Sequence, residues 1–301
     1  GAGGAGFPTH VKLNNKADYF IANGVECEPL LESDKYLMKE RLEDLLEGIS
    51  LIKKELNSHT AILAVKDYFF NSMKNKFKTK NKNGLQIKGI EDFYPSGDEH
   101  ILIYETTGLK VPQGGIPANI KIIVNNVSTI LAVLDAVKKG IPFNRKIVTV
   151  TGEVKKPGIY EIPIGVTYSD ILKNCGGATT EEYKILDGGP MMGFVKTPED
   201  SITKTTNGII ILPTEHIIFN KTRLNDSDMK KMAKAACCQC SRCTELCSRY
   251  ILGHDIEPHR MMRAVYSEEI FSHASLTSTY LCSKCGICTL IACPMMLSPK
   301  E

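Results

Sequence analysis

Eight of the eleven cysteines in this 301-residue sequence form two short runs near its C-terminal end. The first run has the spacing C-x2-C-x2-C-x3-C, and the second has C-x2-C-x2-C-x4-C followed by proline. The eight residues are Cys237, Cys240, Cys243, Cys247, Cys282, Cys285, Cys288 and Cys293. Cysteine thiolates hold iron–sulfur clusters, and three thiolates so closely spaced can surround one face of a cubane. The runs therefore predict two [4Fe–4S] clusters and transfer of single electrons.

The last cysteine of each run is expected to bind the cluster of the other run, as in bacterial two-cluster ferredoxins. Cys293 would then complete the first cluster and Cys247 the second. Two features depart from that pattern, because Ser248 stands where proline is usual and one extra residue precedes Cys293. Neither removes a ligand, but the extra residue should change the loop geometry. Cys238, beside a predicted ligand, is interpreted as a spare thiol buried against the cluster.

Two other uses of clustered cysteines fit this spacing less well. Zinc sites usually combine two separated cysteine pairs, often with histidine, and three evenly spaced cysteines do not match that pattern. A disulfide framework would require an oxidising compartment, and the sequence shows no secretion signal. The thiol-rich composition favours a reducing cytoplasm instead.

The composition is that of an ordinary globular protein, with 43% hydrophobic residues, 24% charged residues and a net charge of +3. So small a charge gives no reason to expect a nucleic-acid partner. No apolar run approaches the roughly 20 residues that a membrane-spanning helix needs, so no direct membrane span is expected. The length is sufficient for two or three domains.

Strand-like and helix-like segments alternate through residues 1–142. Apolar residues spaced by three and four predict an amphipathic helix from Met38 to Leu56. Asn125 and Asn126 are suited to cap a helix that follows them. Such alternation predicts an α/β layer fold with a mainly parallel sheet. The expected strands are residues 19–22, 61–65 and 120–124.

The pattern changes from Lys146 onward. Residues 147–152 alternate with period two, and Lys156-Pro157-Gly158 is a turn signal. We therefore expect a compact, turn-rich β domain over residues 143–217. The remaining residues, 218–301, are first polar and then helical, and they carry the cysteine runs.

Glycines dominate the first six residues, which satisfy the pattern G-x-G-x-x-G with Glu26 about 20 residues further on. In a dinucleotide-binding fold this motif follows a strand and opens a helix, whereas here Phe7-Pro8 follows directly. We therefore reject the dinucleotide-fold interpretation. Glycines still let backbone N–H groups approach a phosphate closely, since no Cβ intervenes.

The glycine loop, with Phe7-Pro8-Thr9 and Lys12 behind it, resembles the flavin loop of the NADH-oxidising flavoprotein subunit of respiratory complex I. The same loop occurs in the C subunit of Rnf electron-transport complexes. Three further segments resemble later motifs of that family in the same order, although Val25 stands where complex I has an acidic residue. These segments are Asn23-Gly24-Val25-Glu26-Cys27-Glu28-Pro29, Tyr94-Pro95-Ser96-Gly97-Asp98-Glu99 and Asn125-Asn126-Val127-Ser128-Thr129.

The resemblance implies a site for FMN and for NADH as the electron donor. Glu26 and Glu28 are implied as the catalytic residues. Their implied role is to orient the nicotinamide, not to transfer protons. Asp98 and Glu99 are implied to line the pocket where NADH stacks on the flavin. The full set of implied cofactor-binding residues is Gly1, Gly3, Gly4, Gly6, Lys12, Asn23, Tyr94, Gly97, Asp98, Glu99, Asn125, Asn126 and Thr129.

Two more segments extend the resemblance over the whole chain. Residues 150–158 resemble the soluble-ligand-binding β-grasp module, and residues 247–259 resemble the cobalamin-reductase branch of the family. That branch belongs to propanediol-utilisation microcompartments. The implied order is an α/β FMN/NADH-binding domain (1–142), a β-grasp domain (143–217) and an α-helical domain with two [4Fe–4S] clusters (218–301).

The resemblance implies an NADH-dependent oxidoreductase that passes electrons through FMN and two clusters to cob(II)alamin. Its partners would be NADH, cobalamin and a corrinoid adenosyltransferase, or another electron-acceptor protein, in the cytoplasm or inside a bacterial microcompartment. Two alternatives stay in the same family, namely the electron-entry C subunit of an Rnf-type membrane complex and the electron-supply protein of proline reduction. A non-enzymatic ferredoxin-like adaptor is a third, and the intact glycine loop argues against it.

Overall fold

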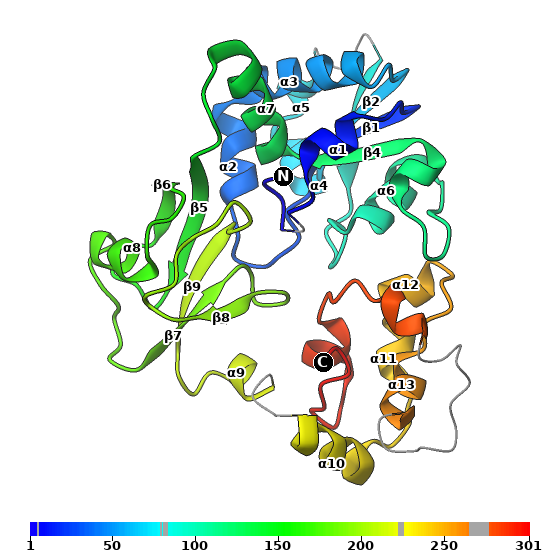
Figure 1. The fold of residues 1–301 in the computed structure, drawn as a ribbon, viewed down its shortest axis with the longest axis vertical. Helices are drawn as coiled ribbons and strands as arrows, with labels where there is room; N and C mark the ends of the chain where they lie inside the picture. The colour runs from blue at the N-terminus through cyan, green and yellow to red at the C-terminus, as the bar shows by residue number, and fades with distance from the viewer. Residues whose placement is uncertain (5, 79, 81–83, 222–225, 265–276) are drawn as a thin grey trace. The chain divides into compact units, whose positions relative to one another are not determined.

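The computed structural model describes residues 1–4, 6–78, 80, 84–221, 226–264 and 277–301 (Figure 1). The chain divides into two compact units, each described here by itself. One unit comprises residues 1–189 and 193–212, and the other comprises residues 190–192 and 213–301. The α/β segment and the β segment after it therefore belong to the same unit. The domain limits at 142/143 and 217/218 stay predictions.

A four-stranded parallel sheet with the order β3-β2-β1-β4 forms the centre of the first segment. Three of its strands lie where short apolar runs predicted them, whereas β3 was missed. The fold class is confirmed as α/β. The strands are β1 (Tyr19–Gly24), β2 (Thr60–Lys66), β3 (Leu85–Ile90) and β4 (Ile122–Asn126).

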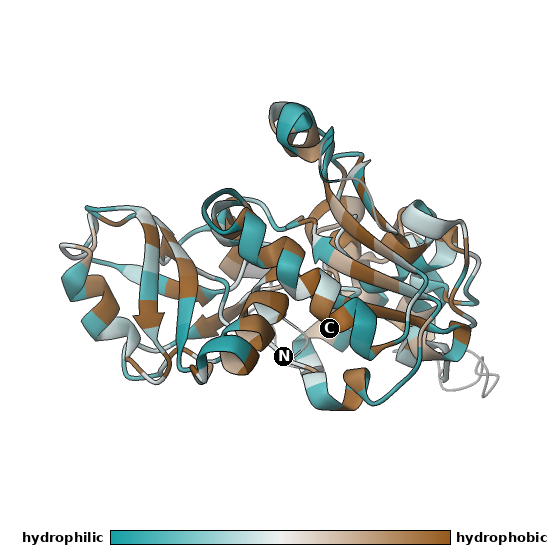
Figure 2. Cartoon of the chain, turned by 90° about the horizontal axis from the view of Figure 1, so that it is seen from above, coloured by the Kyte–Doolittle hydropathy of each residue, from teal (hydrophilic) through white to brown (hydrophobic). Residues whose placement is uncertain are grey.

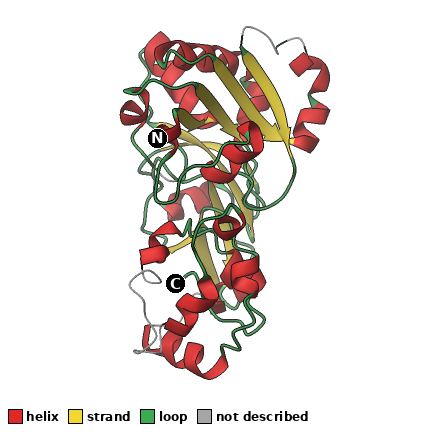
Figure 3. Cartoon of the chain, turned by 90° about the vertical axis from the view of Figure 1, so that its right-hand side faces the viewer, coloured by secondary structure: helices red, strands yellow, loops and turns green. Residues whose placement is uncertain are grey.

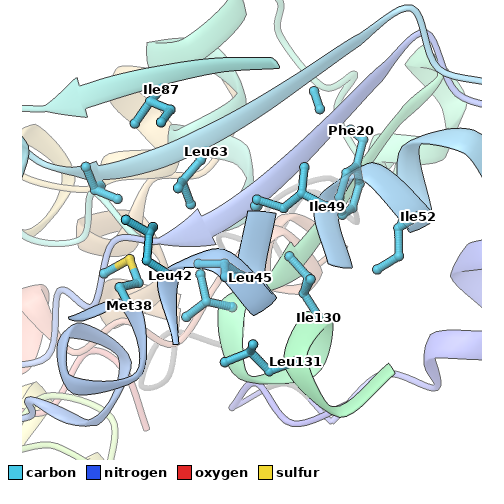
Figure 4. Packing of buried hydrophobic residues seen from close by; sticks show 14 of the residues in the cluster. Phe20, Met38, Leu42, Leu45, Ile49, Ile52, Leu63, Ile87, Ile130 and Leu131 are labelled. Carbon is cyan, nitrogen blue, oxygen red and sulfur yellow. The ribbon is translucent and has the colours of Figure 1, made fainter. Parts of the chain in front are cut away.

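Helices cover both faces of this sheet (Figure 3). The core on one face joins the sheet to helices α2, α3 and α7, and Figure 4 shows Leu45, Ile49 and Ile130 meeting there. The core on the other face includes Leu102 and Ile103 of α6. Because both faces are buried, the strands are apolar over much of their length (Figure 2). The helical elements are α1 (Thr9–Leu13), α2 (Ser33–Glu40), α3 (Leu42–Glu55), α4 (Asp67–Ser72), α5 (Lys74–Lys78), α6 (Glu99–Thr107), the 3₁₀ turn η1 (Pro117–Ile120) and α7 (Val127–Lys139).

The single amphipathic helix predicted from Met38 to Leu56 is wrong, because the structure divides it at Arg41. Arg41 leaves the helical region, with φ −127° and ψ 38°. Its guanidinium donates two hydrogen bonds of 2.8 Å to the carboxylate of Asp135 in α7 and further bonds to Asp44. The apolar stripe continues through the break, so periodicity alone could not reveal it.

A mixed five-stranded sheet with the order β6-β5-β9-β7-β8 completes the first unit. β5 pairs antiparallel with β6 and parallel with β9. Helix α8 packs Tyr168, Ile171 and Leu172 into the core of this sheet, which gives the expected β-grasp arrangement. The elements are β5 (Arg145–Gly152), β6 (Gly158–Pro163), α8 (Tyr168–Asn174), β7 (Tyr183–Asp187), β8 (Phe194–Lys196) and β9 (Gly208–Pro213).

Short helices make up the second unit. A small apolar core joins Ala233, Met262 and Leu297, with Cys237 and Cys293 packed against it. Among the residues that the structure describes, no helix has the length and apolar character needed to cross a membrane. The helices are α9 (Ile217–Lys221), α10 (Asp226–Ala236), α11 (Arg242–Glu245), α12 (Ser248–Ile251), α13 (Pro258–Ala264), the 3₁₀ turn η2 (Ser278–Leu281) and the π turn η3 (Cys288–Ala292).

Gly48 lets α3 approach α7, and we expect Gly48→Ala to destabilise the chain. A Cβ at Gly48 would lie 2.7 Å from Cγ2 and 3.2 Å from the carbonyl oxygen of Ile130. In an open helix, alanine would instead gain about 1 kcal/mol over glycine. Ser50→Ala, on the exposed side of the same helix, is the matched control. Thermal unfolding should show a lower Tm for Gly48→Ala only, and a rise in both would contradict this packing.

Candidate functional site

The carboxyl ends of the parallel strands meet at one edge of the sheet, and the strand order reverses between β1 and β4. Ligands of open α/β sheets bind outside the carboxyl ends of the strands at such a switch point. Asn23, near the end of β1, lies opposite Asn126 of β4, and Ala22 lies opposite Asn125. Two of the predicted motifs are therefore brought together at this edge.

The glycine loop, residues 1–6, lies at the same edge. The Ala2 N–H donates to Oγ1 of Thr129 at 2.9 Å, across 127 residues of sequence. A Cβ at Gly3 would lie 3.3 Å from Cβ of Asn126, whereas one at Gly4 would meet nothing within 4 Å. The loop thus packs on the β4–α7 junction while its centre stays open. Ala5 lies outside the described residues.

Lys12 joins this group from α1. Its ammonium donates to the Val124 carbonyl at 2.9 Å and to Oε1 of Glu99 at 2.7 Å. The predicted cofactor residues Lys12 and Glu99 therefore lie in contact, although 87 residues separate them. The ion pair joins α1 to the start of α6, and the hydrogen bond to Val124 joins α1 to β4.

The two neighbouring asparagines have different hydrogen bonding. Oδ1 of Asn126 caps α7 by accepting the Ser128 N–H at 2.8 Å, and its Nδ2 donates to Asp34 at 2.6 Å. The predicted cap is confirmed. Asn125 is 5% exposed, and its Nδ2 has no hydrogen-bond partner among the described residues. Leaving a buried donor unpaired costs about 1–3 kcal/mol. Because a flavin carries several acceptor oxygens, this amide fits that group.

The segment from Tyr94 to Glu99 links β3 to α6 and closes over the end of β1. Nδ2 of Asn23 donates to the Gly97 carbonyl at 3.0 Å, and its Oδ1 accepts the Val25 N–H at 3.0 Å. A Cβ at Gly97 would collide with the Val25 carbonyl, so glycine is required there. The carboxylate of Asp98 caps α6 by accepting the His100 N–H at 3.0 Å. Tyr94 lies at the start of this segment.

Acidic side chains gather just beyond β1. Burial raises the pKa of Glu26, and the nearby charge of Asp34 raises it further. Burial also raises the pKa of Asp34, against the hydrogen bond from Asn126. Oε1 of Glu26 accepts the Glu28 N–H at 3.1 Å, so the two predicted catalytic residues lie together. Perturbed carboxylates beside an open loop are typical of functional sites.

Sequence reasoning missed two buried charges at this site, Asp34 and Lys146, each 2% exposed. Asp34 carried no signal, because acids are common in the first turn of a helix. Lys146 did carry one. It is in phase with the buried residues Val148 and Val150 of β5, where a lysine is out of place.

In the second unit, four predicted ligands surround one hollow. Cys237, Cys240, Cys243 and Cys293 all line it. Burial, together with the charges of the other three, raises the pKa of Cys243 to about 11. Cys293, the last cysteine of the second run, therefore lies beside the first run, and its role as a ligand there stays a prediction. Cys238 also lines this hollow and is exposed, and its burial against a cluster stays a prediction.

The other four cysteines form a second group. Burial raises the pKa of Cys288, with contributions from Cys285 and Cys282, and the latter two also act on Cys247. The extra residue before Cys293 is accommodated by a π turn, in which the Cys293 N–H donates to the Cys288 carbonyl at 3.2 Å. The expected change of loop geometry is therefore a single widened turn.

Within the described ranges, no three histidine, cysteine or acidic side chains converge closely enough to hold a single metal ion. Thiols around a hollow suit a cubane instead, since its ligands bind at separate corners. The second cysteine run also supplies an N–H donor to sulfur. The Lys284 N–H donates to Sγ of Cys282 at 3.3 Å. All-thiol donor sets of this kind fit iron–sulfur clusters.

Three protein-family models match the chain in the predicted order. They are the Nuo51 FMN-binding domain over residues 1–135, the SLBB domain over residues 147–195 and a 4Fe-4S dicluster domain over residues 236–298. An NAD⁺-reducing [NiFe]-hydrogenase of known structure has the same fold, with a TM-score of 0.63 and 21% identity. That match covers 100% of this chain and 57% of the hydrogenase chain.

Curated relatives are more similar in sequence. Cobalamin reductase PduS of Citrobacter freundii is 36% identical, and the match covers 100% of this chain and 67% of the relative. The C subunit of the proton-translocating ferredoxin:NAD⁺ oxidoreductase complex of Clostridium ljungdahlii is 37% identical, over 83% of this chain and 54% of the relative. The chain belongs to the family of FMN- and iron–sulfur-containing oxidoreductases that includes PduS and these C subunits, and it is an NADH-linked member of that family.

Proposed function

We propose that this chain carries electrons from NADH through FMN and two [4Fe–4S] clusters to cob(II)alamin. We choose cob(II)alamin as the acceptor because the match to the cobalamin reductases covers more of the chain than the matches to the C subunits do. The match to the PduS cobalamin reductases covers 100% of the chain, whereas the matches to the C subunits cover 82–86%. A corrinoid adenosyltransferase is the proposed partner that receives the reduced cobalamin.

The proposed flavin site is the switch point between β1 and β4. Bound FMN would take a hydride from NADH and release the two electrons singly, which suits one-electron acceptors. Lys12 and the backbone of the glycine loop would bind its phosphate, and the unpaired amide of Asn125 would donate to one of its oxygens. Asn126 and Asp98 would shape the site, since both cap helices there.

Glu26 and Glu28 are the proposed residues for the nicotinamide. A carboxyl with a raised pKa stays protonated nearer neutral pH, so Glu26 can donate a hydrogen bond to an amide or hydroxyl group. Protonation also removes the repulsion between an acidic pocket and the NADH phosphates. These side chains orient the donor, and no general acid or nucleophile is required.

Electrons would leave the flavin through two clusters, each held by a group of four cysteines. Cys237, Cys240, Cys243 and Cys293 would hold one cluster, and Cys247, Cys282, Cys285 and Cys288 the other. A second candidate function is electron entry into an Rnf-type membrane complex. It is supported by the 37% identity to the Clostridium ljungdahlii protein.

The proposal is tested by purifying the full-length protein without oxygen and reconstituting it with iron, sulfide and FMN. We expect about one FMN and about eight irons per chain, since each cubane holds four. NADH should then reduce cob(II)alamin, measured by its absorbance. If NADH reduces the clusters and a ferredoxin but leaves cob(II)alamin unchanged, the Rnf-type function holds instead.

Exchange of the last cysteines between runs gives a sharper prediction. Cys293→Ala and Cys243→Ala should remove the same cluster, with iron falling to about four per chain and identical losses in the electron paramagnetic resonance spectrum. Cys247→Ala should remove the other signal. The exposed Cys238, changed to alanine, is the matched control and should keep full iron. Loss of the second-run signal in Cys293→Ala would contradict the exchange.

The acidic pocket should have a stability cost that depends on pH. Burial and Asp34 raise the pKa of Glu26 to about 8 in the folded chain, so the native state holds a proton that the unfolded state releases. Stability therefore falls as the pH rises from about 4.5 to about 8. Glu26→Gln keeps the acceptor oxygen and avoids this loss.

We expect Glu26→Gln to be more stable than the wild type by at least about 1 kcal/mol at pH 8 and nearly equal at pH 4.5. Thermal unfolding of the FMN-free chain measures the difference. Glu55→Gln, on the exposed end of α3, is the control and should show no pH-dependent gain. An equal gain at both pH values would show that Glu26 is ionised at no cost.

A further inference from the structure

Lys146 is a buried lysine in the β-grasp sheet. It lies in β5 in phase with Val148 and Val150, and only 2% of it is exposed. Lysine is almost never fully buried without partners, because an ammonium loses its hydration there. Its position therefore requires a specific set of acceptors and opposite charges.

Those acceptors are backbone carbonyls on two loops. The Lys146 ammonium donates to the Ala2 carbonyl at 2.6 Å and to the Lys204 carbonyl at 2.5 Å. Ala2 is 1% exposed, and its N–H is already bound by Thr129 of α7. Both peptide groups of this residue are thus held, the N–H by helix α7 and the carbonyl by strand β5 of the β-grasp sheet.

The loop of residues 203–206 strengthens the same contact. A Cβ at Gly6 would lie 3.0 Å from Cγ2 of Thr205, so this loop packs on the end of the glycine loop. Thr206 in turn donates to Oδ2 of Asp187 at 3.1 Å. The β-grasp segment therefore contacts the glycine loop in two ways, through the side chain of Lys146 and through residues 203–206.

Three carboxyl groups lie near the ammonium. Asp34, Asp187 and Glu26 act on Lys146 and oppose the effect of burial, which lowers its pKa to about 8. The lysine is thus mainly protonated at neutral pH. Asp34 also accepts from Asn126, so the charge cluster reaches the cap of α7.

We propose that Lys146 is a positioning residue of the flavin site, through which the β-grasp sheet holds the glycine loop in its FMN-binding conformation. Glycine has the largest conformational freedom of any residue, so a glycine loop must be held by groups outside it. Two hydrogen bonds on Ala2 fix the loop at its start, and the Gly6 N–H donates to the Gly3 carbonyl at 2.9 Å, which leaves the N–H groups of Gly3 and Gly4 for the ligand. This inference rests on the proposed binding of FMN by this loop.

The test compares FMN binding by the reconstituted full-length chain with that of Lys146→Met. Methionine fills a similar volume but leaves the Ala2 and Lys204 carbonyls unpaired. We expect FMN to bind at least tenfold more weakly, measured by quenching of flavin fluorescence, with unchanged iron content. Lys155→Met, at an exposed lysine in the connection between β5 and β6, is the control and should bind FMN like the wild type.

A purely structural role gives a different result. It would lower the Tm of the FMN-free chain and leave the rise in Tm on adding FMN unchanged, whereas a positioning role reduces that rise. If Lys146→Met does not fold, Lys146→Gln keeps a donor of shorter reach and should also weaken FMN binding.

FMN affinity within twofold of the wild type in either folded variant would overturn the inference. Failure of the wild-type chain itself to bind FMN would instead overturn the proposed function. The two failures are therefore distinguished by the same titration.

Discussion

A glycine loop cannot hold itself in place, and the first unit is organised around that constraint. Its six residues offer backbone groups and almost no side chains, so their position is set by what surrounds them. Thr129 and Lys146 bind the two peptide groups of Ala2, and Asn126 lies against Gly3. Those residues depend in turn on α7, β4 and β5. Polar contacts at the carboxyl edge, rather than the apolar cores, thus set the geometry of the candidate site.

The same edge accumulates charge that an apolar fold would avoid. Burial shifts the pKa of Glu26, Asp34 and Lys146 toward the neutral form of each, and the charge of Asp34 acts on both of the others. Buried charged groups are costly even when they are paired. Their presence beside an open loop and an unpaired amide is understandable if a ligand repays the cost. A folded protein without such a ligand would gain stability by replacing them.

Local patterns in the sequence predicted the elements but not the contacts between them. The strands around Phe20, Leu63 and Ile123 follow from short apolar runs, and the cap at Asn126 follows from its side chain. The break at Arg41 could not be predicted, because it depends on Asp135, 94 residues away. The same holds for Lys146. Its phase in β5 marks it as unusual, yet nothing local shows that its partner is the second residue of the chain.

The π turn from Cys288 to Ala292 also links the two groups of thiols that would hold the proposed clusters. Cys288 belongs to one group of thiols and Cys293 to the other, so the turn forms a short covalent bridge between the groups. A wider turn holds one more residue in almost the same length of helix, which keeps the bridge compact despite the insertion. Electron tunnelling slows steeply with distance. The widened turn can thus be regarded as a spacer that keeps the two groups of thiols near one another for electron exchange.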